Sequence, residues 1–322
     1  MPNAPLDHTA VLAAAARIAP HAHRTPVLRS ASLDALAGAS LHFKCENLQR
    51  SGAFKFRGAC NAVMALDDAT AARGVVTQSS GNPGAALALA ARVRGIPAHV
   101  VVPEGAVAGK LAAIEAAGAT LHRCAPTIAA REAMAEAVRA RTGATLVHPY
   151  TDPHVIAGQG TAALELLAET GPLDALMTPI GGGGLIGGSA IAAHGRFPDL
   201  PVFGAEPEGA AETFESLRQG RRVTDFTPDT ICDGLRGTVG ALNLQLMRDH
   251  RVEALLVSDD EVLAAMRLLL ERLKVLVEPS GATVLAAVLR HRERFAGRRV
   301  GLILSGGNVD RAVLAALASR PD

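Results

Sequence analysis

The sequence predicts an α/β protein of two domains, each built on a largely parallel, twisted sheet flanked by helices. The chain of 322 residues is longer than one small core requires. Apolar residues make up 49% and charged residues 20% of it, which is typical of a globular protein. Short runs of β-forming residues alternate with alanine-rich helical runs, and this alternation indicates β-α-β units with parallel strands.

Charge and composition exclude several classes of protein. A formal net charge of +1 without basic runs, together with no Trp and one Tyr, argues against nucleic acid as a partner. The sequence contains no uninterrupted stretch of about 18 strongly apolar residues, so we expect no membrane span. The four cysteines form no Cys-x-x-Cys pair and predict reduced, buried thiols in a cytoplasmic protein rather than a zinc site: Cys45, Cys60, Cys124 and Cys232.

The middle of the chain predicts the first sheet. Its β-rich runs each precede a helical run, and the last of them leads into a long helix that begins near Thr127; the runs are 74–79, 98–103 and 120–124. A further strand is expected near residue 145. We therefore predict a small domain over 64–151.

The rest of the chain predicts the second sheet. We expect its β-rich runs to form one sheet with the N-terminal segment; the runs are 175–180, 201–206 and 299–305. We assign 1–63 and 152–322 to this large domain. Region 219–250 mixes Pro, Gly and Asp, and it predicts an elaborate loop.

Three glycine-rich turns follow predicted strands, where ligands bind in such folds. The first, "PIGGGGLIGGSA" at 179–190, opens a helix, and its glycines allow backbone N–H groups to converge on an anion such as phosphate. It lacks the lysine of a nucleotide-triphosphate loop and the spaced glycines of a dinucleotide site. The alternative is a flexible turn with close helix packing.

The other two turns have plainer alternatives. "QSSGNPGAALA" at 78–88 offers two hydroxyls and an amide at one tip, although Ser and Asn also cap helices. "LILSGGNVD" at 302–310 places Ser305 at the end of a strand, and Asn308 is a candidate cap for the last helix.

Lys55 is unusually placed, near the start of a helix between Phe54 and Phe56. Burial by the rings and the helix N-terminus both disfavour a cation, and so lower the pKa of the amine. A neutral amine can form a Schiff base with a carbonyl group. The alternative is a lysine that extends to water. Together with a phosphate cradle and polar loop tips, Lys55 points to pyridoxal phosphate, which carries an aldehyde and a phosphate.

Five motifs, in this order, resemble the fold-type-II pyridoxal-phosphate enzymes, which have a tryptophan synthase β-like fold: "SGAFKFRGA", "SSGNPGAALA", "GGGGLIGG", "EPSGA" and "LSGGNVD". The resemblance runs from residue 24 to the final helix, and it is strongest to the threonine/serine dehydratase and serine racemase group. A small-molecule amino acid substrate and a homodimer are what this resemblance implies.

The resemblance also implies roles by position. Lys55 would bond to the aldehyde of the cofactor and move the α-proton, while Phe54 would pack beside the cofactor ring. Asn82 would hydrogen-bond the ring hydroxyl, and Ser305 would face the pyridine nitrogen. The residues that would hold the phosphate are Gly181, Gly182, Gly183, Gly184 and Leu185.

Further site residues follow from the same resemblance. Ser80 matches the serine that acts as acid/base on the face opposite the lysine in the racemases. Glu278 and Gly234 would lie near the cofactor ring. The loop that would bind the substrate carboxylate comprises Ser79, Ser80, Gly81 and Asn82.

The expected reaction is dehydration of L-threonine or L-serine to a 2-oxo acid and ammonia by β-elimination. The Ser305 hydroxyl cannot hold a pyridinium as a carboxylate would, and this weaker electron sink suits elimination. Alternatives are serine racemisation and dehydration of 3-hydroxyaspartate. Two features favour dehydration of 3-hydroxyaspartate. Pro83 stands where the family usually has histidine, and His148 and Arg131 could contact a side-chain carboxylate. A non-catalytic phosphate-binding protein is disfavoured by Lys55.

Two expectations concern a metal and regulation. "GAEPEGAAETF" resembles the divalent-metal segment of the racemase branch, with Glu206, the carbonyl of Ala210 and Glu212 as oxygen ligands for Mg²⁺ or Ca²⁺. The alternative is a solvated acidic helix start. The chain ends soon after its last predicted helix, so we expect a catabolic-type enzyme without a C-terminal regulatory domain.

Overall fold

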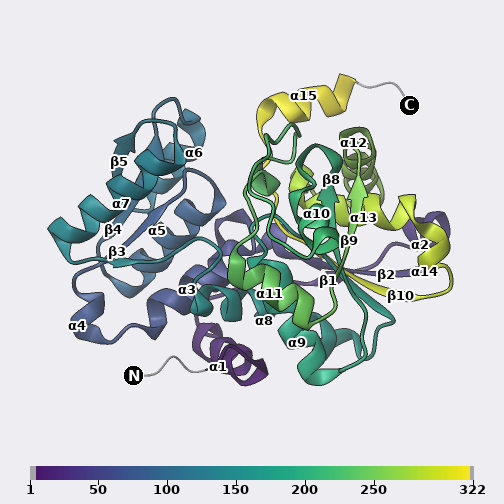
Figure 1. The fold of residues 1–322 in the computed structure, drawn as a ribbon. Coiled ribbons are helices and arrows are strands. Elements are labelled where there is room, and N and C mark those ends of the chain that lie inside the picture. Colours follow the sequence, from purple (N-terminus) through teal and green to yellow (C-terminus); the bar gives the residue numbers. More distant parts are fainter. Residues whose placement is uncertain (1–4, 320–322) are drawn as a thin grey trace.

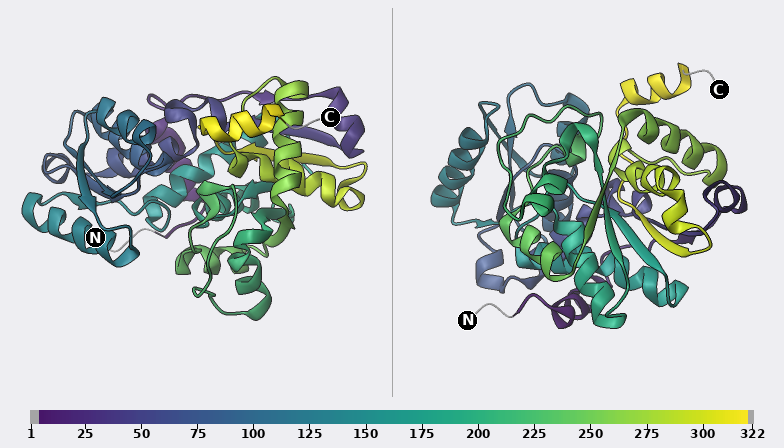
Figure 2. Two further views of the ribbon diagram at one scale, coloured as in Figure 1. Left: turned by 90° about the horizontal axis from the view of Figure 1, so that it is seen from above. Right: turned by 45° about the vertical axis from the view of Figure 1, so that its right-hand side comes forward.

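The chain folds into two lobes, each with its own sheet, in a computed structural model that describes residues 5–319. Figure 1 shows the lobes side by side, with α3 (Lys55–Ala65) and α8 (Pro153–Thr170) packed against each other between them. The lobes also lie apart in the left-hand view of Figure 2. The predicted α/β class is therefore confirmed.

The large-lobe sheet has six strands in the order β1-β2-β10-β7-β8-β9. Neighbouring strands run parallel except for the antiparallel pair β1–β2, which the N-terminal segment supplies as expected. Its strands are β1 (Val27–Leu28), β2 (Ser40–Cys45), β7 (Ala175–Pro179), β8 (Val202–Pro207), β9 (Glu253–Val257) and β10 (Arg299–Leu304).

The small-lobe sheet has four parallel strands in the order β5-β4-β3-β6. Its side chains alternate between two helix layers, because Val101 packs with α7 and Val100 with α6. The strands are β3 (Val75–Gln78), β4 (Ala98–Pro103), β5 (Thr120–Cys124) and β6 (Thr145–Leu146), and the helices are α4 (Asp68–Ala71), α5 (Asn82–Arg94), α6 (Ala108–Ala116) and α7 (Ile128–Thr142).

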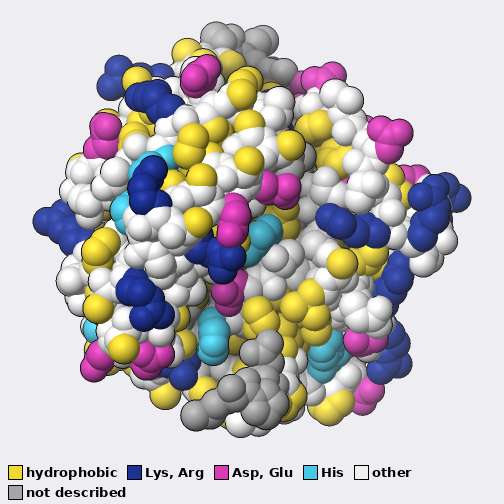
Figure 3. All heavy atoms as spheres, turned by 60° about the vertical axis from the view of Figure 1, so that its left-hand side comes forward, with side chains coloured by type: hydrophobic (Ala, Val, Ile, Leu, Met, Phe, Trp, Pro, Cys, Tyr) yellow, Lys and Arg dark blue, Asp and Glu magenta, His cyan; other side chains and the backbone are white. Residues whose placement is uncertain are grey.

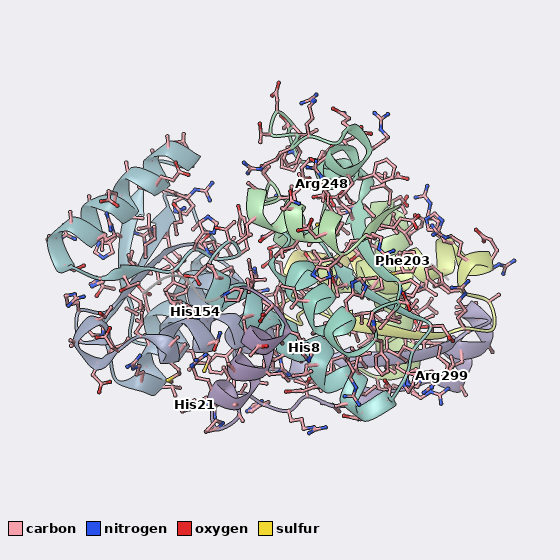
Figure 4. All side chains as sticks on the ribbon, turned by 60° about the horizontal axis from the view of Figure 1, so that its bottom comes forward. His8, His21, His154, Phe203, Arg248 and Arg299 are labelled. Carbon is pink, nitrogen blue, oxygen red and sulfur yellow. The ribbon has the colours of Figure 1, made fainter. Side chains whose placement is uncertain are left out.

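Helices cover both faces of the large sheet. One core layer includes Phe203 of β8, which Figure 4 labels and whose ring meets that of Phe295 edge-on, with ring centres 5.3 Å apart. The helices are α1 (His8–Ile18), α2 (Ala31–Ala37), α9 (Gly184–Arg196), α10 (Glu212–Gln219), α11 (Ala241–Asp249), α12 (Asp259–Leu268), α13 (Pro279–Arg290), α14 (Arg292–Phe295) and α15 (Arg311–Ser319).

Short helical turns complete the lobe. A π-helical turn, Leu269–Leu273, extends α12. The 3₁₀ turns are Glu46–Leu48, Arg50–Gly52, Glu208–Ala210 and Asp233–Leu235.

One predicted segment differs from the structure. Region 219–250 is not a loop throughout, because it contains α11. The Gly and Pro residues that precede this helix hid the helix-forming run "ALNLQLMRD". All strands of the small sheet lie within 64–151, and all strands of the large sheet lie outside it. The division into these two domains stays a prediction. Residues 1–4 and 320–322 lie outside the described part.

The surface and helix lengths bear on possible partners. On the face shown in Figure 3, basic and acidic side chains are interspersed rather than gathered by sign. Within residues 5–319, no helix is both long enough and apolar enough to cross a membrane.

Candidate active site

A cavity of about 1520 Å³ lies where β3, β7 and β10 end. Lys55 and residues of all three glycine-rich turns line it, although the turns are far apart in sequence. The carboxyl ends of parallel strands are where α/β folds bind ligands. The cavity therefore brings together the residues that the sequence singled out.

Lys55 is the first residue of α3, as predicted, and opens onto the cavity. Burial lowers the pKa of its amine to about 8, an effect that the nearby Glu278 carboxylate partly opposes. Its Nζ donates to the carbonyl oxygen of Pro149 at 3.3 Å and lies 4.9 Å from the centre of the Phe54 ring. Lys55 is thus a partly buried amine with a raised neutral fraction, not a fully exposed surface lysine.

The glycine-rich turn at 181–184 leads directly into α9. Gly181 and Gly183 have φ angles of 53° and 86°, a region that favours glycine. A Cβ on Gly182 would come within 2.5 Å of the Tyr150 ring, so this turn has no room for a side chain there. First-turn N–H groups of a helix lack acceptors within that helix, and those of Gly184 and Leu185 belong to this class. The turn fits a phosphate cradle.

The serine-containing loop does not act as a helix cap. The N-cap of α5 is Gly81, which makes no side-chain capping bond, so the capping alternative is wrong. Ser79 uses its hydroxyl to accept from the N–H of Gly81 at 3.3 Å. Ser80 lines the cavity beside Gly81. Pro83 occupies the first turn of α5, where its missing N–H is tolerated.

Asn82 links the two lobes across the cavity. Its amide nitrogen donates to both oxygens of Glu278, at 3.1 and 3.2 Å. Its amide oxygen accepts from Asn308 at 2.8 Å, and Asn308 also donates to the carbonyl of Ser51. Asn308 therefore bridges the lobes instead of capping the last helix. A ligand hydroxyl at Asn82 would have to share or replace these bonds.

The remaining predicted ring neighbours line the same cavity. Ser305 follows β10 directly and is 3% exposed. Glu278 is 4% exposed and is the N-cap residue that precedes α13. Gly234 donates its N–H to the hydroxyl of Ser280 at 3.1 Å. The structure places all three where a flat aromatic ligand held by Lys55 could meet them.

The segment after β6 contributes residues that the sequence did not assign firmly. His148 accepts from the N–H groups of Tyr150 and Thr151 at Nδ1, so the neutral ring carries its proton on Nε2. Burial, with the nearby Lys55, lowers the pKa of His148 to about 4. Tyr150 and Arg131 also line the cavity. Tyr150 was missed because only the folded chain brings it onto Gly182.

The predicted metal ligands lie apart from the cavity lining, around the end of β8. Glu206 and Glu212 are both buried, and burial raises the pKa of each carboxyl. Glu206 accepts from the N–H groups of Thr213 and Phe214, whereas one oxygen of Glu212 is buried without a partner. Ala210 is buried between them in sequence. Oxygen ligands of this kind suit Mg²⁺ or Ca²⁺.

These ligands do not make a dense cluster. Among residues 5–319, no group of three or more His, Cys, Asp or Glu side chains could hold a metal ion. The predicted set instead depends on two carboxylates and one carbonyl, so the cation stays a prediction.

The cavity fits pyridoxal phosphate. It offers an amine with a lowered pKa, a cradle that a Cβ would fill, and a buried hydroxyl at Ser305. When bound, the cofactor would supply an electron sink for a bond that breaks at the substrate Cα. Lys55, Asn82 and the 181–185 turn are the residues that would hold it.

Known proteins resemble the chain along most of its length. It is 47% identical over 298 residues to a serine racemase of Dictyostelium discoideum, covering 91% of this chain and 92% of the relative. It is 46% identical over 300 residues to a beta-hydroxyaspartate dehydratase of Paracoccus denitrificans, covering 93% and 95%.

A solved structure of a related protein has the same fold. The T.th. threonine deaminase superposes with a TM-score of 0.90 at 43% identity, covering 94% of this chain and 99% of that one. Residues 18–306 match the family model described as "Pyridoxal-phosphate dependent enzyme". The resemblance inferred from five motifs is thereby confirmed, and the chain belongs to the fold-type-II pyridoxal-phosphate-dependent enzymes.

Proposed function

We propose that the chain is a pyridoxal-phosphate-dependent ammonia-lyase that dehydrates β-hydroxy amino acids, with L-threonine and L-serine as its first candidate substrates. The observation that carries the proposal is Lys55, a partly buried amine whose pKa is lowered to about 8 in a cavity shared with a phosphate cradle. The threonine deaminase likeness supports this choice of substrates.

Different residues would bind the substrate and transfer its proton during elimination. The N–H groups of the 79–82 loop would bind the substrate carboxylate and fix the orientation of its Cα. Neutral Lys55 would then accept the α-proton at Nζ, because its lowered pKa gives the amine a larger neutral fraction near neutral pH than an ordinary lysine has. Loss of the β-hydroxyl as water leaves an enamine, which hydrolyses after release to a 2-oxo acid and ammonia.

Ser305 favours this outcome over reactions that need a long-lived carbanion. It is the hydroxyl that borders the cavity at the end of β10. A neutral hydroxyl stabilises a positive ring nitrogen less than a carboxylate does. Electron density is therefore better released with the β-leaving group.

A second candidate substrate is 3-hydroxyaspartate, and Arg131 is the observation that favours it. Arg131 lines the cavity from the first turn of α7, and among residues 5–319 no carboxylate is recorded within ion-pairing distance of it. A guanidinium is well suited to a second substrate carboxylate. The Paracoccus denitrificans relative, described as a beta-hydroxyaspartate dehydratase, points the same way.

Racemisation of serine is the remaining alternative, because Ser80 lines the cavity and could protonate Cα from the face opposite Lys55. The serine racemase of Dictyostelium discoideum supports this option. A divalent cation at Glu206, Ala210 and Glu212 is part of the proposal, with the unpartnered oxygen of Glu212 in its support.

A homodimer and a cytoplasmic location complete the proposal. All four cysteines are free and buried, which suits a reducing compartment. The homodimer rests on the family resemblance.

The test is a substrate panel on protein loaded with pyridoxal phosphate. L-serine, L-threonine and 3-hydroxyaspartate are supplied separately, with and without Mg²⁺, and 2-oxo acid and enantiomer composition are measured. We expect 2-oxo acid from at least one substrate. Racemised serine with negligible 2-oxo acid would replace the lyase with a racemase, and a protein that never takes up the cofactor would refute both.

Arg131→Gln sharpens the panel. We expect it to raise KM for 3-hydroxyaspartate by roughly tenfold or more while leaving KM for L-serine nearly unchanged, because only the first substrate carries a second carboxylate. Arg139→Gln, on the exposed side of the same helix, is the matched control. Equal effects of Arg131→Gln on both substrates would remove Arg131 from substrate selection.

A further inference from the structure

Asn243 is a fully buried polar residue behind the active site. It lies on α11, with 0% exposure, and α11 packs against α9, the helix that the glycine-rich turn opens. Asn243 does not line the cavity. Asn243 can therefore affect the active site only through the residues that it contacts.

Its amide nitrogen holds two carbonyl groups from different parts of the chain. Nδ2 donates to the carbonyl oxygen of Gly182 at 2.5 Å and to that of Tyr150 at 2.9 Å. Carbonyl oxygens only accept, so the nitrogen of the amide must face them and its orientation is determined. One side chain thus joins the glycine-rich turn to the segment after β6.

The contact fixes the conformation of the glycine-rich turn. The carbonyl of Gly182 also accepts from the N–H of Gly240 at 3.2 Å, and neither of its two donor residues lines the cavity. A Cβ on Gly183 would meet the Cβ of Asn243 at 2.7 Å, so the turn rests directly on this residue. With its carbonyl held at the back, the turn keeps its cavity side free for N–H groups.

The second contact reaches the surroundings of Lys55. Tyr150, whose carbonyl Asn243 holds, directly follows Pro149, and the carbonyl of Pro149 accepts from Lys55. The ring of Tyr150 also lies directly against Gly182. Asn243 therefore couples the turn that would hold the phosphate to the segment that contacts the amine.

The amide oxygen of Asn243 carries a cost that the two bonds of its amide nitrogen must offset. Oδ1 is buried without a hydrogen-bond partner. An unpartnered buried acceptor is unfavourable for folding. An apolar side chain would avoid that penalty, but it would take a donor from the carbonyl of Tyr150 and leave the carbonyl of Gly182 with the N–H of Gly240.

We propose that Asn243 is a positioning residue that holds the glycine-rich turn in its phosphate-binding conformation. The inference rests on the proposed function, because it concerns the phosphate of the same cofactor. It assigns to the chain a determinant of cofactor affinity outside the cavity, and it predicts that this determinant acts on the phosphate group rather than on the ring.

The test compares two ligands that differ only in the phosphate. Dissociation constants of the apoprotein for pyridoxal 5'-phosphate and for pyridoxal are measured by absorbance titration for the wild type, Asn243→Leu, Asn243→Ser and Gln245→Leu. Asn243→Leu keeps the approximate size of the side chain, and Asn243→Ser is the smaller change in case the first variant does not fold. Gln245→Leu is the control, because Gln245 is on the same helix but its amide binds exposed Asp249.

We expect the Asn243 variants to bind pyridoxal 5'-phosphate roughly tenfold to hundredfold more weakly, with pyridoxal affinity changed less than about threefold. Gln245→Leu should match the wild type for both ligands. An unchanged affinity for pyridoxal 5'-phosphate, or an equal loss for both ligands, would overturn the inference. Wild-type protein that binds neither ligand would instead refute the proposed function, so the two failures are distinguishable.

Discussion

Two lysines of one short stretch, Lys44 and Lys55, are both withdrawn from bulk water but have opposite surroundings. Lys44 is 0% exposed, and its Nζ donates to Glu165 at 2.6 Å and to the carbonyl of Thr25 at 2.7 Å. For Lys55 the structure records a single hydrogen bond, to the carbonyl of Pro149, and a cavity beside it. Lys44 is the more deeply buried of the two, so burial alone does not make a reactive amine.

The difference lies in the neighbouring carboxylates. Lys44 shares Glu165 with Arg57, and Arg57 also makes a bidentate pair with buried Glu46. Positive and negative charges are balanced within this cluster, which holds the start of α3 against β2 and α8. Lys55 has Glu278 nearby, but Asn82 donates to both oxygens of that carboxylate. Lys44 therefore has a direct carboxylate partner, whereas no such pair is recorded for Lys55 among residues 5–319, and burial lowers the pKa of the Lys55 amine.

The largest expected effect separates the two lysines by function. Lys55→Ala should lower kcat for 2-oxo acid formation by more than about 10³-fold, because it removes both the cofactor attachment point and the proton acceptor. The rate is measured on protein supplied with saturating pyridoxal 5'-phosphate. Lys274→Arg, at an exposed position, is the control. Full activity of Lys55→Ala would show that Lys55 is not needed for catalysis and would contradict the functional difference between Lys44 and Lys55.

Lys44→Met should show the reverse pattern. We expect it to lower the free energy of unfolding by about 1–3 kcal/mol, because the carbonyl of Thr25 loses its donor and Glu165 loses one of two cations. Denaturant unfolding of the apoprotein gives this value, and kcat of the folded variant should stay close to the wild type. A large loss of kcat without loss of stability would contradict the structural role of Lys44.

The pH dependence of cofactor uptake gives the smallest predicted effect. The pKa of Lys55 is lowered, so the neutral amine is the minor form below about pH 8 and the major form above it. The rate of uptake of pyridoxal 5'-phosphate by the apoprotein should therefore rise about tenfold per pH unit below 8 and level off above it. Stopped-flow absorbance measures this rate, and a plateau that starts only near 10.5 would show an unperturbed lysine.

Local sequence patterns were sufficient for most of the fold. The run 98–103 predicted β4 to the residue, and the alternation of strands and helices predicted two parallel sheets. Lys55 and the turn at 181–184 were also predictable, because a lysine between phenylalanines and four successive glycines are strong local signals. The relatives later confirmed the family that these motifs indicated.

Contacts between distant segments could not be predicted. Asn82 meets Glu278 and Asn308 only because the two lobes face each other in the folded chain. Arg57 was part of a quoted motif, but nothing local indicated that Glu46 and Glu165 would both pair with it. Asn243 was missed because its helix lay inside a region expected to be a loop.

The central claim is that Lys55 is the lysine that bonds to the cofactor, and one measurement tests it most directly. The sequence holds four lysines: Lys44, Lys55, Lys110 and Lys274. Protein loaded with pyridoxal 5'-phosphate is reduced with borohydride, digested and mapped by mass spectrometry. We predict a pyridoxyl label on Lys55 at close to one per chain and none on Lys44. A label on a different lysine, or no label on a protein that binds the cofactor, would contradict the account.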